Sequence, residues 1–182
     1  MNLKNLLAAK RTRIIKRWRE LTLAAYPDDA QRFLKNEKNR FANPVGRTIS
    51  EAIAVLYDEL LKGEGSESVS SALDRIIRIR AVQDLKPSQA IGFIFQLKAI
   101  IGEELATAAQ ESDFSEEIQE IEIAIDNMAL MGFDIYTQCR QKIYEIRVSE
   151  VQGQVSGLLR RANARSKNAE KAADFEKNDG ER

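Results

Sequence analysis

The segment from Pro87 to Leu105, PSQAIGFIFQLKAIIGEEL, carries apolar side chains on most sides of a helix. Pro87 suits a helix start, because the first helical position needs no free N–H. The apolar residues form two stripes at helical spacing: Ile91, Ile94, Ile101 and Leu105 on one, and Ala90, Phe93, Leu97 and Ile100 on the other. A helix that is apolar on most sides is surrounded by other helices. We therefore predict that this segment is the centre of a helical domain.

Apolar residues at helical spacing also precede the central segment. A helix from about Leu3 to Ala25 would bury one face, which consists of Leu3, Leu7, Ile14, Trp18, Leu21 and Ala25. Asn43-Pro44 is a helix start, because Asn accepts a hydrogen bond from the free amides of the first turn. The inward residues of that helix would be Val45, Ile49, Ile53, Leu56, Leu60 and Leu61, before a loop over residues 62–66.

A further helix is predicted to open at Ser68 or Ser70. Its expected buried residues are Leu73, Ile76, Ile77 and Val82, and its expected outward residues are Arg75, Arg78 and Arg80. A strand over residues 77–82 is conceivable, because isoleucine and arginine alternate there, but it would have no evident partner strand. The fold class predicted from these segments is all-α.

The last third of the sequence predicts one long helix. From about Ser115 onward there is no proline, and an apolar stripe recurs at spacings of three and four: Ile118, Ile121, Ile125, Met128, Gly132, Ile135, Cys139, Ile143 and Ile146. Such a stripe is expected to lie in a groove over its whole length. A second seam then begins, with the a/d heptad spacing of a coiled coil: Tyr144, Val148, Val151, Val155, Leu158 and Ala162.

A helix from Ser115 to Arg165 would be about 75 Å long at about 1.5 Å per residue. We therefore expect its second half to project and to pair with a second copy through Tyr144, Val148, Val151, Val155 and Leu158. The alternative is that these residues fold back on the same chain as a hairpin. The expected organisation is a helical domain over residues 1–147, a coiled-coil-like extension over 148–165 and a disordered polar tail over 166–182.

Composition narrows the class of protein. The 182 residues are 43% hydrophobic, which excludes disorder throughout, and nine glycines with three prolines are too few turn residues for an all-β fold. Histidine is absent, so the commonest metal ligand and general base are missing. The single cysteine, Cys139, cannot close an intrachain disulfide, which fits a reducing cytoplasm. The most apolar stretch is too short for a membrane span.

Charge is balanced overall but unevenly placed. The 28 basic residues equal the 28 acidic ones, so a strongly basic nucleic-acid binder is not the default interpretation. The first helix is basic, whereas residues 99–139 hold ten acidic side chains and no lysine or arginine. We favour basic helices that face acidic ones, within or between subunits. The alternative is a patch for anionic lipid or nucleic acid, formed by Lys10, Arg11, Arg13 and Arg17.

Few residues suggest chemistry. Cys139 lies in the apolar stripe and is expected to be a buried hydrophobe, although a haem- or gas-sensing protein could use Cys139 or a tyrosine as ligand. The sequence has no glycine-rich phosphate loop, nucleophile elbow or Cys-x-x-Cys motif. We therefore expect neither an enzyme nor a bound cofactor or metal.

Three stretches carry a family resemblance: Asn39 to Ile49 (NRFANPVGRTI), Asp74 to Gln83 (DRIIRIRAVQ) and Pro87 to Ala90 (PSQA). With the Trp18 helix before them, they resemble the RsbRD-type N-terminal domain, the sensor half of stressosome RsbT co-antagonist proteins. The resemblance covers about residues 1–150.

The resemblance implies a haem-free, globin-like, dimeric domain that passes a signal through a projecting C-terminal helix to a STAS output domain. No STAS domain follows in this sequence. We therefore expect a stand-alone sensor or adaptor for a stress response, whose output passes to a separate, unidentified protein. The resemblance assigns no ligand residues.

Overall fold

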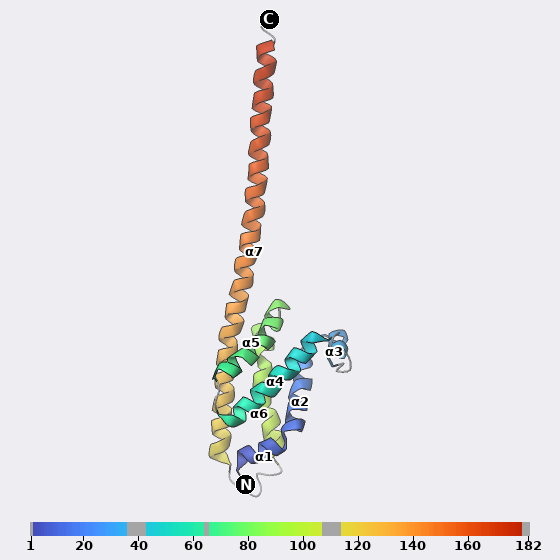
Figure 1. Cartoon of the computed structure of the whole chain (residues 1–182), viewed down its shortest axis with the longest axis vertical. Coiled ribbons are helices and arrows are strands. Elements are labelled where there is room, and N and C mark those ends of the chain that lie inside the picture. The colour runs from blue at the N-terminus through green and yellow to red at the C-terminus, as the bar shows by residue number, and fades with distance from the viewer. Residues whose placement is uncertain (1, 36–42, 64–65, 107–113, 180–182) are drawn as a thin grey trace. The chain divides into compact units, whose positions relative to one another are not determined.

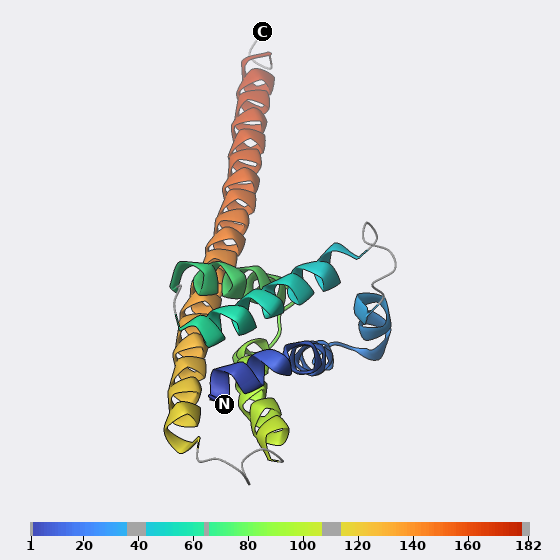
Figure 2. The same ribbon diagram turned by 60° about the horizontal axis from the view of Figure 1, so that its bottom comes forward.

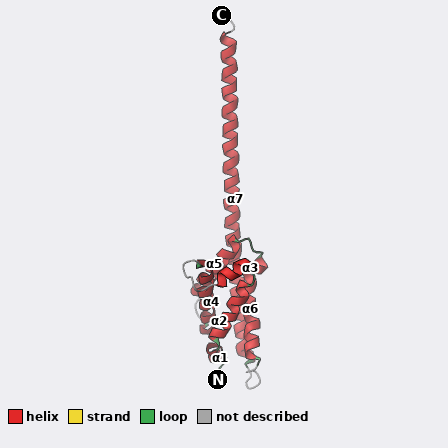
Figure 3. Cartoon of the chain, turned by 90° about the vertical axis from the view of Figure 1, so that its right-hand side faces the viewer, coloured by secondary structure: helices red, strands yellow, loops and turns green. Residues whose placement is uncertain are grey.

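A computed structural model describes residues 2–35, 43–63, 66–106 and 114–179. These residues form seven helices and no strand (Figures 1 and 3). The helices are α1 (Leu3–Ala9), α2 (Arg11–Leu23), α3 (Asp28–Lys35), α4 (Pro44–Lys62), α5 (Ser66–Val82), α6 (Pro87–Leu105) and α7 (Ser115–Asp179). The predicted all-α class and long C-terminal helix are confirmed. Residues 1–140 and 141–182 are two compact units, which are described in turn.

The N-terminal segment is two helices, so the prediction of a single helix from Leu3 to Ala25 is wrong. Lys10 leaves helical geometry at φ −92° and ψ 3°, and α2 ends at Leu23. The apolar stripe jumps seven residues from Leu7 to Ile14, with Lys10 and Arg11 between them. Because no buried side chain holds this stretch against the core, the chain can bend there.

Helix α4 starts where the sequence predicts. The Asn43 side chain accepts a hydrogen bond from the Gly46 amide at 2.9 Å, and its own amide donates to the Leu34 carbonyl at 2.9 Å. Gly46 is needed at this approach, because a Cβ there would lie 2.5 Å from the Leu34 carbonyl oxygen. The helix ends at Lys62, and its cap residue Gly63 has a left-handed φ of 73°, which favours glycine.

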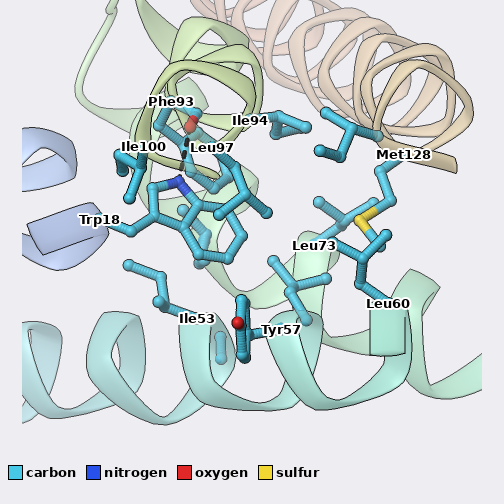
Figure 4. Packing of buried hydrophobic residues seen from close by; sticks show 14 of the residues in the cluster. Trp18, Ile53, Tyr57, Leu60, Leu73, Phe93, Ile94, Leu97, Ile100 and Met128 are labelled. Carbon is cyan, nitrogen blue, oxygen red and sulfur yellow. Dashed lines mark hydrogen bonds between the residues drawn. The ribbon is translucent and has the colours of Figure 1, made fainter. Parts of the chain in front are cut away.

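Helix α6 lies at the centre of the core, as predicted, and all eight residues of its two stripes are buried. Trp18 of α2 packs against Phe93, with ring centroids 6.1 Å apart, and its indole N–H donates to the Phe93 carbonyl at 2.6 Å. Figure 4 shows Trp18 between these α6 side chains and Ile53 and Tyr57 of α4. Helices α4 and α5 pack side by side against this core (Figure 2).

The first part of α7 completes the core of residues 1–140. Ile121, Ile125 and Met128 of the predicted stripe are buried, and Ile135 and Cys139 are half-buried. Gly132 allows a close approach, because a Cβ there would lie 3.0 Å from the Ile94 Cδ1 atom and 3.1 Å from the Ile77 Cδ1 atom.

Helix α5 contradicts two sequence predictions. Arg80, expected on the outside, is fully buried, and Val82, expected inside, is 74% exposed. Arg75 and Arg78 are exposed, as expected. Helical spacing explains the result: Arg80 follows Ile76 and Ile77 by four and three residues on the buried face, whereas Val82 falls on another face.

The second unit consists of the rest of α7, from Gln141 onward. Ile143 is half-buried and Ile146 is 51% exposed, so the prediction of a groove along the whole first stripe is wrong at its end. The helix runs to Asp179, past the expected start of a disordered tail after Arg165. The boundaries of the domain, the extension and the tail stay predictions. None of the helices described is both long and apolar enough to cross a bilayer.

Candidate functional site

Arg80 reaches from α5 into the core between α2 and α6. One terminal nitrogen donates to the carbonyls of Gln89 at 2.8 Å and Ala90 at 3.2 Å, and the other donates to the Thr22 carbonyl at 2.7 Å. Thr22 lies in the last turn of α2, where carbonyl oxygens lack partners within the helix. The Arg80 cation therefore caps α2 and ties it to the start of α6.

Two aromatic rings cover the same guanidinium. The Arg80 Cζ atom lies 4.7 Å from the centroid of Phe93 and 5.6 Å from that of Tyr26, which is within cation–π range. Burial lowers the pKa of Arg80 and raises the pKa of the Tyr26 phenol, and each group opposes the shift of the other. Arginine still keeps its charge in proteins. The Arg80 Nε atom and the Tyr26 hydroxyl are buried without a hydrogen-bond partner among the described groups.

The α5–α6 turn, directly after Arg80, is held by two side chains of α7. The Tyr136 hydroxyl donates to the Leu85 carbonyl at 2.6 Å. Arg140 donates to the Ala81 carbonyl at 3.1 Å and lies 2.6 Å from the Asp84 carboxylate. Asp84 has a left-handed φ of 59°, which non-glycine residues rarely adopt. We call Tyr136 and Arg140, with the turn that they hold, the turn latch.

The turn latch and Arg80 act on adjacent residues. Arg80 fixes the last turn of α5 to α2 and α6, and the turn latch fixes the next five residues to α7. A movement of α2 or α6 relative to α5 would therefore strain contacts that also position α7. This arrangement can couple the movements of these helices. Within the described residues, no three His, Cys, Asp or Glu side chains come together to hold a metal ion.

The basic residues of the predicted anionic-partner patch lie beside acidic side chains of the same chain. Lys10 and Arg13 both pair with Glu104 of α6, Lys10 at 3.4 Å and Arg13 at 2.7 Å. Lys10 also donates to the Glu104 carbonyl. Arg17 lies 3.4 Å from Glu103. The favoured arrangement, basic helices that face acidic ones, is thus present within the chain.

Arg11 pairs with α4 rather than with the acidic segment. Its guanidinium makes two hydrogen bonds of 2.7 Å to the two carboxylate oxygens of Asp58. This hydrogen bonding lowers the pKa of Asp58 below its usual range. An anionic ligand would have to compete with carboxylates already bound to all four cations, so the patch stays a prediction that this pairing does not favour.

The five residues predicted to pair two copies are all exposed. Tyr144, Val148, Val151, Val155 and Leu158 are between 50% and 63% exposed. They lie on one continuous helix, and within 141–179 the structure has no turn that would return the seam as a hairpin.

The candidate haem ligands are engaged in other ways. Cys139 is a half-buried thiol packed against the core, and burial raises its pKa, which disfavours the thiolate that would bind iron. The Tyr57 hydroxyl donates to the Leu7 carbonyl at 2.9 Å, and the Tyr136 hydroxyl is part of the turn latch.

Sequence reasoning missed Arg80 and the turn latch. The signal for Arg80 was its spacing of seven from Leu73 and of three from Ile77, but its charge suggested an outward side chain. Tyr136 stands four residues before Arg140, so both point from one face of α7. No pattern in the sequence showed that this face meets the carbonyls of a distant turn.

A scan of family models finds a match to the RsbT co-antagonist protein rsbRD N-terminal domain over residues 12–151. No curated protein and no solved structure matches the chain. The family match spans α2 to α6 and the part of α7 that holds the turn latch. It covers well over half of the sequence, and the chain therefore belongs to the family of rsbRD N-terminal domains of RsbT co-antagonist proteins.

Proposed function

We propose that this chain is a non-enzymatic, haem-free sensor or adaptor domain that forms a homodimer and relays a signal by protein–protein interaction. Membership of the rsbRD N-terminal family supports a sensing and signalling role of the stressosome type, and the family is generally non-catalytic. The signal passes to a protein partner.

The observation that carries the proposal is the exposed seam of α7. Five large apolar side chains at a/d heptad spacing are each at least half exposed. A single helix with such a seam gains free energy when a second helix covers it, because apolar side chains leave water and interlock. A second copy of this chain offers the same seam.

The turn latch supports the relay. Tyr136 and Arg140 hold α7 to the α5–α6 turn, whose other side is tied to the core by Arg80. A ligand or protein that binds one arrangement of these helices more tightly than another shifts the population toward that arrangement. Since α7 is one continuous helix, the shift reaches the seam as a rotation or translation of that helix.

Light scattering on the full chain tests the dimer. The double variant Val151→Glu/Leu158→Glu places two carboxylates in the seam, and we expect the mass of a monomer where the wild type has the mass of a dimer. The matched control is Ser149→Glu/Ser156→Glu, which adds the same charges seven residues apart on exposed positions outside the a/d seam and should stay dimeric. A wild type with monomeric mass, or a seam variant that remains dimeric, would refute the proposal.

A further inference from the structure

A small cavity lies between the end of α6 and the start of α7, away from Arg80 and the turn latch. Its volume is about 170 Å³. Five large apolar side chains line it: Ile101, Leu105, Ile118, Ile121 and Ile125. Four of them are at most 5% exposed, so the wall belongs to the core of residues 1–140.

Gly102 and Ala106 provide the space on the α6 side of the cavity. A Cβ added to Gly102 would meet no atom within 4 Å. These two positions lie one helical turn apart, and both residues are exposed, so the cavity opens to solvent on this side. An apolar ligand that enters from there would take the apolar walls out of contact with water.

The charged residues at the cavity do not favour an anionic ligand. The Lys98 ammonium donates to the Asp126 carboxylate at 2.8 Å, and the third charged residue of this region, Glu122, is an acid. An anionic ligand would face the Glu122 carboxylate and a lysine that is already paired with a carboxylate. An uncharged ligand is not repelled by the carboxylate and does not have to compete for the paired lysine.

We propose that this cavity binds a small uncharged apolar molecule about the size of one aromatic ring. A dry cavity of about 150 Å³ lined by leucine, isoleucine and phenylalanine is known to take up benzene or xenon. Drug-sized ligands occupy pockets of about 300–1,000 Å³, so the volume here selects for smaller molecules. Binding itself does not depend on the dimer; its use as a signal rests on the proposed relay, since the ligand would contact the first turns of α7.

The test is a titration of the full chain with benzene, followed by NMR of isoleucine δ1-methyl groups. We expect saturable shifts at Ile101, Ile118, Ile121 and Ile125, with Ile14 and Ile49 unshifted as buried isoleucines outside the cavity. Benzoate, the same ring with a carboxylate, should bind at least about ten-fold more weakly. Uniform or non-saturable shifts would overturn the proposed site, and equal or tighter binding of benzoate would overturn the proposed ligand class.

A pair of glycine variants on α6 supplies the matched control. Gly102→Leu should fill the cavity and weaken benzene binding at least about ten-fold, whereas Gly92→Leu should leave it unchanged. Both glycines have open space at Cβ, but only Gly102 lines the cavity. Equal binding by the two variants would contradict the proposal, and a variant that fails to fold leaves the wild-type methyl titration as the deciding measurement. A negative titration beside an intact dimer would overturn the cavity proposal alone.

Discussion

Arg80 and the cations of α2 carry the same charge in opposite surroundings. The Arg80 side chain is fully buried and binds three backbone carbonyls and two aromatic rings. The side chains of Arg11, Arg13 and Arg17 are 44%, 78% and 52% exposed, and each pairs with a carboxylate. A buried cation here has neutral partners, whereas the exposed cations have charged ones.

The difference shows why counting ion pairs says little about this fold. An exposed pair is screened by water and contributes up to about 1 kcal/mol. Arg80 loses its hydration, and the hydrogen bonds that replace it connect α5 to α2 and α6 and pair the Thr22 carbonyl, which lies in the last turn of α2. We therefore expect Arg80, which binds carbonyls and aromatic rings instead of a carboxylate, to contribute more to stability than the exposed arginines of α2.

The largest expected effect is that of Arg80→Ala. The change leaves a cavity and an uncapped carbonyl at the end of α2, so the free energy of unfolding should fall by about 3 kcal/mol in urea denaturation. Arg80→Lys keeps the charge but not the planar guanidinium group. Its free energy of unfolding should therefore lie between those of Arg80→Ala and the wild type.

Arg78→Ala is the matched control for this prediction. Arg78 lies on the same helix, is 68% exposed and pairs with Asp74 within one turn. Its loss should change the free energy of unfolding by no more than about 0.5 kcal/mol. If the two alanine variants were equally stable, the burial of Arg80 would have no energetic meaning.

Two neighbouring glutamates allow an intermediate test. Glu104 is 7% exposed and pairs with Arg13 at 2.7 Å, whereas Glu103 is 62% exposed and pairs with Arg17 at 3.4 Å. Glu104→Gln should lower the free energy of unfolding by about 1–2 kcal/mol, because it removes a nearly buried negative charge from its two cations. The loss is limited because those cations can rehydrate. Glu103→Gln should stay within about 0.5 kcal/mol of the wild type. A larger loss for Glu103→Gln would mean that exposure does not set the strength of these pairs.

The sequence was enough to predict the all-helical class, the central helix and part of the way in which the charges meet. Apolar spacing placed α6 at the centre, Asn43-Pro44 marked the start of α4, and the separation of basic from acidic segments predicted that the two would face each other. Each of these features is local or depends on composition alone, so no knowledge of distant contacts was required.

The candidate site could not be predicted in the same way. Residue type outweighed spacing for Arg80, because a charged side chain is rarely buried without a charged partner. The gap in the apolar stripe allows a bend at Lys10 but does not require one. The turn latch depends on where the backbone carbonyls of a distant segment lie, and carbonyl positions leave no trace in residue identity. The cavity beside Gly102 likewise depends on what fails to fill a space between two helices.

The smallest expected effect is the pH-dependent loss of the exposed ion pair between Arg11 and Asp58. Hydrogen bonding to Arg11 lowers the pKa of Asp58, so the native state holds this proton more weakly than the unfolded chain does. The stability that the pair contributes is therefore present above the unfolded pKa of about 4 and is lost as the pH falls through the lower native value. The Asp58 side chain is 37% exposed, which limits the contribution to about 0.5 kcal/mol or less. Urea denaturation at a fixed protein concentration should show wild type more stable than Asp58→Asn at pH 7, with the difference shrinking below about pH 4 and in high salt. A difference that persists unchanged to pH 2 would show that the substitution acts through packing and not through charge. Asp58 would then contribute to stability through its contacts, as Arg80 does, and not as the exposed ion pairs do.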